Sequence, residues 1–381
     1  MKAFSGSLSL LLRMATYVRK SKLFKFSLFL ILIIVFLEIF LRINYREQLK
    51  TRINPEIFRP DSLYSVRYIP NSKSLISSPG VHYPVSINSH GFIGDEFNRM
   101  RMKGVFRIII VGMSESTPLH MNSDNSYSVL LQKLFQLYGI RAEVINCAIN
   151  GGGKNIQNLR LVKNELIYFQ PDLILFNAPS SGLFEERQYV YEIYKGYTLN
   201  YDPFDALSRD ICIKRVEKIE RSWYITSIYD CSYIVRALCK KYIEINNPDW
   251  NNQEVFLRNK PFEIFLYTYI RKESYFPTIT YSYTYERVIE MINEIKTILS
   301  QTNGDIILYN YGNFENELKD IYAETGIGYF ELKLNDRFSS LPINSELEGH
   351  MNEIGHSLVA ERLFQQIILN DVIQSKYFNQ K

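Results

Sequence analysis

The spacing of hydrophobic positions along this chain changes twice, and each spacing predicts a different kind of structure. A continuous apolar run, LFKFSLFLILIIVFLEIFL, occupies residues 23–41. Residues 42–104 carry scattered prolines, serines and asparagines without a sustained period, which is typical of an irregular stalk or strap. From residue 105 to residue 381, short apolar runs alternate with segments of helical periodicity, which indicates α/β layers around a parallel sheet.

The alternating part contains candidate strands separated by candidate helices. One helix is expected to end at Asn303-Gly304, and the last is expected to begin at Asn352 as its N-cap. The pattern therefore predicts a three-layer α/β/α domain with a mainly parallel, doubly wound sheet. The expected strands are residues 106–111, 144–149, 172–176, 305–309 and 328–332. The expected buried helix positions are Leu159, Val162, Leu166 and Phe169, then Val288, Ile292, Ile295 and Leu299, and finally Ile354, Leu358, Val359 and Leu363.

The alternation is interrupted at about residues 183–280. This segment is rich in aromatic residues and is interpreted as an insertion that forms a cap over one sheet edge. Aromatic rings could stack on sugar rings, but we expect most of them to pack the cap, because tyrosine combines apolar area with a hydroxyl that finds a partner. The aromatic residues in question are Tyr189, Tyr191, Tyr194, Tyr197, Tyr201, Trp223, Tyr224 and Tyr229.

The apolar run at 23–41 is long enough to cross the hydrocarbon core of a bilayer as a helix. A cleaved signal peptide and a buried core helix are the alternatives; an uncleaved anchor is favoured because no small-residue cleavage site follows the run. Residues 1–22 form a basic tail, which by the positive-inside rule lies in the cytoplasm and leaves the main domain outside. Four cations just after the run weaken that asymmetry: Arg42, Arg46, Lys50 and Arg52.

Composition narrows the classes of function. The net charge of +4 is too small to indicate a nucleic-acid partner. Cys147 lies in an apolar run and is expected to be a buried thiol, while Cys212, Cys231 and Cys239 could supply one disulfide outside the cytoplasm. No CxxC pair or zinc-like cluster of cysteine and histidine occurs, so the sequence predicts neither a metal site nor a cofactor.

Candidate chemistry gathers where ligands bind in such folds, beyond the carboxyl ends of the strands. Ser114 follows the first strand, the Asn150–Gly153 turn follows the second, Asn177 follows the third, and His350 precedes the last helix. A hydroxyl on a strand-to-helix turn, a glycine that lets a backbone N–H approach an oxyanion, and an imidazole base are the groups that acyl transfer through a serine requires.

These residues also carry a family resemblance. The segments VGMS at 111–114, NCAINGGG at 146–153 and GHMNEIGHSLVAERL at 349–363 resemble, in that order, the first, second and fifth blocks of the SGNH (GDSL-like) hydrolases. INSHGFIGDE at 87–96 resembles the strap of membrane-anchored members. The resemblance covers roughly residues 60–181 and 283–370, and it implies the flavodoxin-like SGNH fold.

Carried over by position, the resemblance makes Ser114 the nucleophile and His350 the general base. The backbone N–H groups of Ser114 and Gly151 would form the oxyanion hole, with the Asn177 amide as a third donor. No metal or organic cofactor is implied.

The chain departs from the family pattern at three places. Met113 stands where an aspartate commonly precedes the nucleophile, and Asn177 comes slightly early for the oxyanion amide, where Pro179 or Ser180 stands instead. Leu347 occupies the position three residues before the histidine, where the family usually has an acid. Glu348 is the chosen partner of His350, with Glu346 second and a backbone carbonyl third.

Plainer interpretations exist for each residue. Ser114 could cap a helix, Ser116 could be the exposed serine instead, and the glycine run could be only a tight turn, since it fits no phosphate-binding motif. His356 falls inside the last expected helix and is interpreted as structural. No comparable support exists for His82, His90 and His120.

The sequence thus predicts a serine esterase that is membrane-anchored and extracytoplasmic. Its substrate would be an acyl ester, such as an acylated carbohydrate or a lipid. One alternative is an O-acyltransferase, such as an O-acetyltransferase of a cell-surface polysaccharide, which would use the same serine and histidine. Another is a non-catalytic surface protein that keeps the fold.

Overall fold

The structure of the chain is a computed structural model. It describes residues 22–46, 57–78, 81–150, 154–178, 185–187, 190–195, 197–204, 206–221, 228, 231–246, 280–282, 284–311, 316–334, 344 and 350–378.

A five-stranded parallel sheet forms the centre of the main domain, with the strand order β13-β12-β7-β5-β6. Leu175 of β7 lies in register between Ile110 of β5 and Ile307 of β12. The predicted parallel, doubly wound sheet is therefore confirmed. The strands are β5 (Phe106–Val111), β6 (Ala142–Asn146), β7 (Leu173–Asn177), β12 (Asp305–Asn310) and β13 (Gly328–Glu331).

The second strand, β6, ends three residues before the predicted end at residue 149. The side chain of Asn146 explains this end. Its amide nitrogen donates to the Ser116 carbonyl at 2.8 Å, and its oxygen accepts from the backbone N–H of Ala148 at 3.0 Å. The chain turns around this asparagine, although Cys147 still donates its N–H to the Ile110 carbonyl at 2.8 Å.

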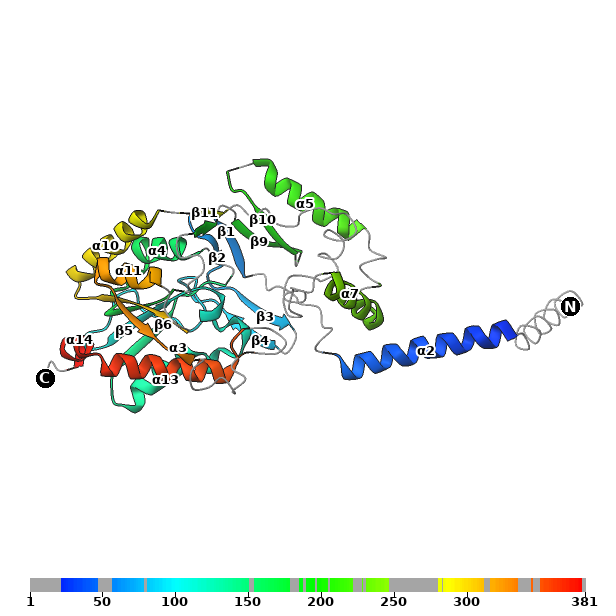
Figure 1. Cartoon of the computed structure of the whole chain (residues 1–381), viewed down its shortest axis with the longest axis horizontal. Helices are drawn as coiled ribbons and strands as arrows, with labels where there is room; N and C mark the ends of the chain where they lie inside the picture. Colours follow the sequence, from blue (N-terminus) through cyan, green and yellow to red (C-terminus); the bar gives the residue numbers. More distant parts are fainter. Residues whose placement is uncertain are drawn as a thin grey trace, which may run out of the picture.

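Helices cover both faces of the sheet (Figure 1). Alternate residues of β5 point to opposite faces, so Ile108 joins one core cluster and Ile109 joins the other. The first face is covered by α3 (Tyr127–Leu137) and α13 (Glu353–Leu369), and the second by α4 (Asn155–Asn164), α10 (Tyr285–Gln301) and α11 (Asn316–Thr325). This arrangement confirms the predicted three-layer α/β/α architecture.

Two helix ends follow the predicted signals. Asn303, two residues after the end of α10, has a left-handed backbone with φ of 61°. The Asn352 side chain accepts the N–H groups of Ile354 and Gly355 at the start of α13. Ile354 was predicted to be buried and is 43% exposed, because the buried face of α13 begins with Gly355 and continues through Val359. The segment 166–169 is a 3-10 turn after α4, with Leu166 and Phe169 buried as expected.

Two β-hairpins lie in the range 42–104, where the sequence predicted irregular structure. The first pairs β1 (Phe58–Asp61) with β2 (Ser65–Tyr68), and the second pairs β3 (Lys73–Ser78) with β4 (Val81–Ser86). Their apolar residues join the core cluster that α4 and α10 cover. The sequence shows no alternation of apolar and polar residues in these short strands, because a polar residue can also be buried. Arg67 of β2 is buried, and its guanidinium pairs with the Glu165 carboxylate at 2.8 Å.

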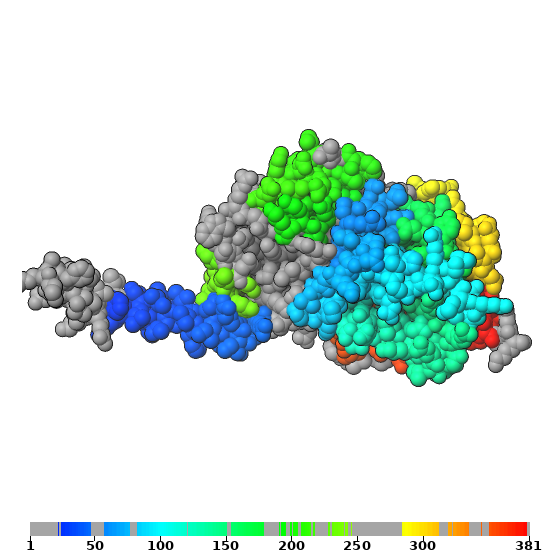
Figure 2. All heavy atoms as spheres, turned by 180° about the vertical axis from the view of Figure 1, so that it is seen from behind, coloured from blue at the N-terminus to red at the C-terminus, as the bar shows by residue number. Residues whose placement is uncertain are grey.

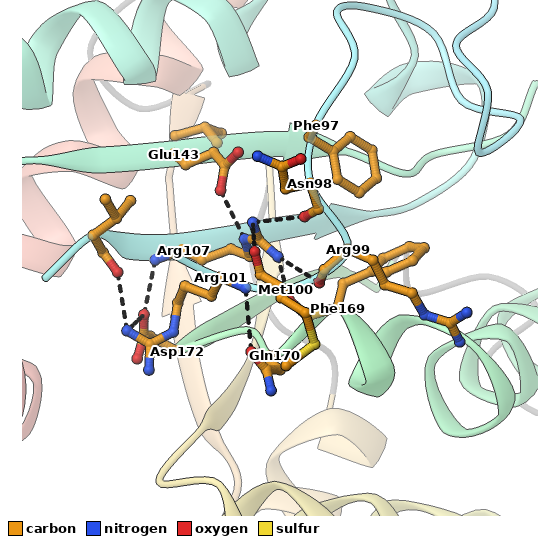
Figure 3. Close-up of polar contacts among 12 residues, drawn as sticks. Phe97, Asn98, Arg99, Met100, Arg101, Arg107, Glu143, Phe169, Gln170 and Asp172 are labelled. Carbon is orange, nitrogen blue, oxygen red and sulfur yellow. Dashed lines mark hydrogen bonds and ion pairs between the residues drawn. The ribbon is translucent and has the colours of Figure 1, made fainter. Parts of the chain in front are cut away.

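Arg107 fixes the end of this strap segment to the amino ends of the strands (Figure 3). Its side chain is fully buried, and its Nε donates to the Glu143 carboxylate at 2.7 Å. The remaining guanidinium hydrogens go to the carbonyls of Asn98, Arg99, Met100 and Phe169, at 2.5–3.4 Å. The Arg107 backbone N–H donates to Asp172 at 2.8 Å. One buried cation thus joins β5, β6 and the loop at 97–101.

The predicted insertion contains a hairpin of β9 (Val190–Tyr194) and β10 (Tyr197–Tyr201), followed by α5 (Ala206–Arg221) and α7 (Tyr233–Asn246). Its two ends pair as β8 (Glu185–Arg187) and β11 (Thr280–Ser282). A small separate core contains Val190, Leu199, Tyr201, Val216 and Cys239. Tyr201 packs as expected, and its hydroxyl donates to Glu192 at 2.9 Å. Tyr189, Trp223, Tyr224 and Tyr229 lie outside the described residues.

One helix, α2 (Lys22–Asn44), projects away from the main domain (Figure 1). Among the described residues, it is the helix that is long and apolar enough to cross a membrane. At the opposite end of the molecule, α14 (Asp371–Ile373) leads to the last described turn. All four cysteines are free, so the disulfide suggested for Cys212, Cys231 or Cys239 is not formed, while Cys147 is buried as predicted.

Candidate active site

The turn after β5 presents Ser114 and buries Ser116. Ser114 begins a three-residue 3-10 turn, closed by a bond from the Ser116 N–H to the Met113 carbonyl at 2.9 Å. Ser114 is half-buried, whereas Ser116 has no exposed area. The expected strand-to-helix turn is replaced here by this short turn, since α3 begins only at Tyr127. Of the two candidate serines, Ser114 is the one that reaches the surface.

Gly112 allows this turn to pack closely. A Cβ at this position would lie 2.2 Å from Ser116 Oγ and 3.1 Å from the Asn177 Cβ. Any larger residue would therefore push Ser116 out of its place beneath the turn.

A buried polar layer holds the turn from below. The Asn177 amide nitrogen donates to Ser116 Oγ and to the Tyr311 hydroxyl, each at 2.8 Å. Deeper in the core, the hydroxyls of Tyr127 and Tyr309 are 2.7 Å apart. Burial raises the pKa of all three tyrosines well above the ordinary value, so their hydroxyls stay neutral.

Asn177 was predicted to point its amide at the oxyanion. In the structure the residue is 2% exposed and its amide nitrogen serves Ser116 and Tyr311. Asn177 at the end of β7 therefore supports the turn that carries Ser114 and Ser116, and its part in an oxyanion hole stays a prediction.

His350 lies near the same turn. It is half-buried and stands two residues before the N-cap of α13, next to Met351, which pairs with Asn344 in an antiparallel bridge. His350 is close enough to the Glu115 carboxyl to act on its pKa, so the histidine lies in the neighbourhood of the turn that carries Ser114.

Glu115 is a site residue that the sequence analysis did not select. Glu115 is an exposed residue, yet desolvation of its carboxyl raises its pKa. The nearby His350 opposes the shift by favouring the charged carboxylate. The only sequence signal was its place between the two candidate serines.

Gly151, Glu348 and Glu346 lie outside the described residues, so the second oxyanion donor and the predicted partner of His350 stay predictions. Asn155, at the start of α4 just after the glycine turn, is fully buried, and neither of its side-chain polar atoms has a partner among the described residues. Such groups are rare in folded proteins and are typical of sites that hold water or a ligand.

Two other histidines have structural contacts. His356 is buried in α13, and its Nδ1 accepts the N–H of Tyr127 at 3.1 Å, which agrees with its structural interpretation. His90 bonds the Phe97 carbonyl at 3.0 Å and stacks on the Phe97 ring. Neither belongs to the serine turn.

Comparisons with known proteins were made at three levels. No family model matches the chain, and no curated protein matches it. Among solved structures, the esterase EstA from Pseudoalteromonas sp. is 11% identical with a TM-score of 0.36, covering 69% of this chain and 96% of its own. The acetyl xylan esterase AlAXEase is also 11% identical, with a TM-score of 0.35, covering 69% of this chain and 100% of its own.

A GDSL-like lipase from Bacteroides thetaiotaomicron is 9% identical with a TM-score of 0.28, covering 68% of this chain and 86% of its own. The solved structures that resemble this chain thus include an esterase, an acetyl xylan esterase and a GDSL-like lipase.

Proposed function

We propose that the chain is a membrane-anchored serine esterase whose nucleophile is Ser114 and whose general base is His350. The observation that carries the proposal is the half-buried Ser114 at the carboxyl end of β5, on a turn that is held by a buried polar layer and has His350 in its neighbourhood. A fixed nucleophile beside an imidazole is the arrangement that acyl transfer requires.

In the proposed reaction, neutral His350 takes the proton of Ser114 Oγ as that oxygen bonds to the ester carbonyl carbon. The backbone N–H groups of Ser114 and Gly151 stabilise the oxyanion that forms. His350 then gives its proton to the leaving alcohol oxygen as the carbon–oxygen bond breaks. Water, deprotonated by the same imidazole, releases the acid and restores Ser114.

The proposed topology assigns residues 1–22 to the cytoplasm, 23–41 to the bilayer and 42–381 to the outside. It is supported by the long apolar stretch of α2 between Lys25 and Glu38 and by the six cations in the first 25 residues. The proposed substrate is an acyl ester of a carbohydrate or a lipid, which the chain would meet at the membrane surface.

A fluorophosphonate probe tests the proposed chemistry, because it reacts with an activated serine whatever the natural substrate is. We expect an adduct on Ser114 of the purified full chain, located by peptide mass spectrometry. The adduct should disappear in Ser114→Ala and in His350→Ala, and it should persist in Ser123→Ala, which changes a serine of a separate short turn.

A folded protein without an adduct would refute the esterase proposal and favour a non-catalytic surface protein. An adduct on Ser116 would move the nucleophile by two residues.

A further inference from the structure

The end of α2 nearest the main domain is joined to α7 by the carboxylate of Glu38. This carboxylate accepts the N–H groups of Tyr233 at 2.9 Å and Ile234 at 3.0 Å, and the hydroxyl of Ser232 at 3.1 Å. The first N–H groups of a helix have no carbonyl partner within the helix. Glu38 therefore caps α7, and its negative charge lies at the helix end that favours it.

Arg42, one turn further along α2, strengthens the same junction. Its Nε lies 2.8 Å from the Glu38 carboxylate, and its guanidinium stacks over the Tyr233 ring with a centroid distance of 5.1 Å. The guanidinium also donates to the Cys231 carbonyl. Two side chains on one face of α2 thus fix the start of α7 to the anchor helix.

The two faces of α7 have different surroundings. Val235 and Cys239, four residues apart, pack in the small core of the insertion. The outward side carries an apolar stripe of Leu238, Tyr242 and Ile245, which are 65%, 46% and 68% exposed. The spacing of four and three residues places these side chains in one row along the helix.

The apolar stripe belongs to the helix whose start contacts α2, and the apolar span of α2 is itself uncovered by the rest of the described chain. Figures 1 and 2 both show α7 against the end of α2 that is nearest the main domain. Glu38 is three residues from the end of the proposed span at residue 41. In the proposed topology, the capping bonds would hold the start of α7 at the depth where hydrocarbon meets the lipid headgroups.

The residues around the stripe suit that depth. Tyr242 is one of the stripe residues, and Lys241 is exposed next to it. Tyrosine is enriched at membrane interfaces, and a lysine can bury its methylene stem while its ammonium stays in water. A helix with an apolar row, flanking cations and a polar junction at its start is typical of helices that lie in the plane of the membrane surface.

We infer that α7 is an interfacial helix, whose Leu238, Tyr242 and Ile245 side chains insert among lipids beside α2 and hold the insertion against the bilayer. This inference rests on the proposed membrane anchoring of α2. It adds a second lipid contact, supplied by the insertion itself.

The test places a photoreactive p-benzoylphenylalanine at Leu238 or Ile245 of the full chain, in nanodiscs of phosphatidylcholine and phosphatidylglycerol. Ile33, in the middle of α2, is the reference for insertion. Leu369 is the matched control, since it is 79% exposed and ends α13 at the opposite end of the molecule. We expect lipid adducts at Leu238 and Ile245 to be several-fold more abundant than at Leu369.

The reference position separates the possible failures. Adducts at Ile33 without adducts at Leu238 and Ile245 would overturn the inference and leave the anchor in place. Absence of adducts at Ile33 as well would overturn both. Crosslinks from Leu238 and Ile245 to a second copy of the chain, in place of lipid, would show that the stripe is a protein interface.

A Glu38→Leu variant tests the role of the junction. Leucine keeps the anchor helix apolar but removes the acceptor that caps α7. We expect lipid adducts at Leu238 and Ile245 to fall several-fold, with unchanged adducts at Ile33. Unchanged adducts at all three positions would show that Glu38 does not set the depth of α7.

Discussion

The amide nitrogen of Asn177 lies 2.8 Å from Ser116 Oγ, so the end of β7 holds the turn that follows β5. The same nitrogen is 2.8 Å from the Tyr311 hydroxyl, which follows β12. Three adjacent strands thereby share one polar contact, which holds the short turn that begins with the half-buried Ser114.

This contact predicts the effect of Asn177→Leu. The change removes the amide that donates to the Ser116 and Tyr311 hydroxyls, which lie 3.4 Å from each other, and we expect it to cost about 1–3 kcal/mol of unfolding free energy. We also expect slower fluorophosphonate labelling of Ser114, because the turn loses its support. Urea unfolding and labelling rates measure the two effects.

Tyr311→Phe is the matched control for that prediction, because it removes one hydroxyl and leaves the bond from Asn177 to Ser116. Its effect on labelling should be smaller than that of Asn177→Leu. Equal labelling in Asn177→Leu and the unchanged protein would show that the layer does not position Ser114.

We expect the substitution of Arg107, at the other end of β5 from Ser114, to lower the unfolding free energy strongly. Arg107→Met keeps much of the apolar stem but leaves the Glu143 carboxylate and several carbonyls at the strap without their donor. Breaking a buried ion pair in this way costs about 3–5 kcal/mol. Urea unfolding should show this loss, while the labelling of Ser114 in the remaining folded protein stays unchanged.

The matched control is Arg287→Met, which removes an exposed arginine paired with Glu290 three residues later. Its effect should be small, since exposed ion pairs contribute little. A similar loss of stability in both variants would show that the buried network around Arg107 contributes no more to the unfolding free energy than an exposed ion pair does.

Glu115 predicts a dependence of stability on pH. Because its pKa is raised in the folded chain, the folded state binds more protons than the unfolded state just above the ordinary glutamate pKa. Stability should therefore fall as pH rises through that window. Glu115→Gln should remove this fall and raise the unfolding free energy at neutral pH, as measured by urea unfolding from pH 4 to pH 7.

Glu96 supplies a control of opposite sign. Hydrogen bonds from Ser89 lower its pKa, so its contribution is present at neutral pH and is lost as pH falls through the lowered pKa. Glu96→Gln should thus lower stability at neutral pH. An unchanged pH profile in Glu115→Gln would contradict the desolvation of its carboxyl.

Periodicity was sufficient to predict the sheet and the two long helices that flank it. The five strands are short apolar runs, and the buried faces of α10 and α13 repeat at helical spacing through Val288, Ile292, Val359 and Leu363. These signals are local, because each depends on the pattern of hydrophobic and polar residues along one strand or helix.

The hairpins at 58–86 and the role of Asn177 could not be predicted in this way. Arg67 and Arg107 read as polar positions in the sequence, yet both are buried because distant carboxylates and carbonyls reach them in the fold. The partners of Asn177 are 61 and 134 residues away in sequence. Which side chain an amide meets depends on tertiary contacts that no local pattern contains.

The pairing of β8 with β11 means that the insertion leaves and re-enters the main domain at one place. A segment with adjacent ends can lengthen, shorten or be exchanged over evolutionary time without changing the path of the central strands. The segment that we propose to contact lipid can therefore diverge independently of the part that holds Ser114.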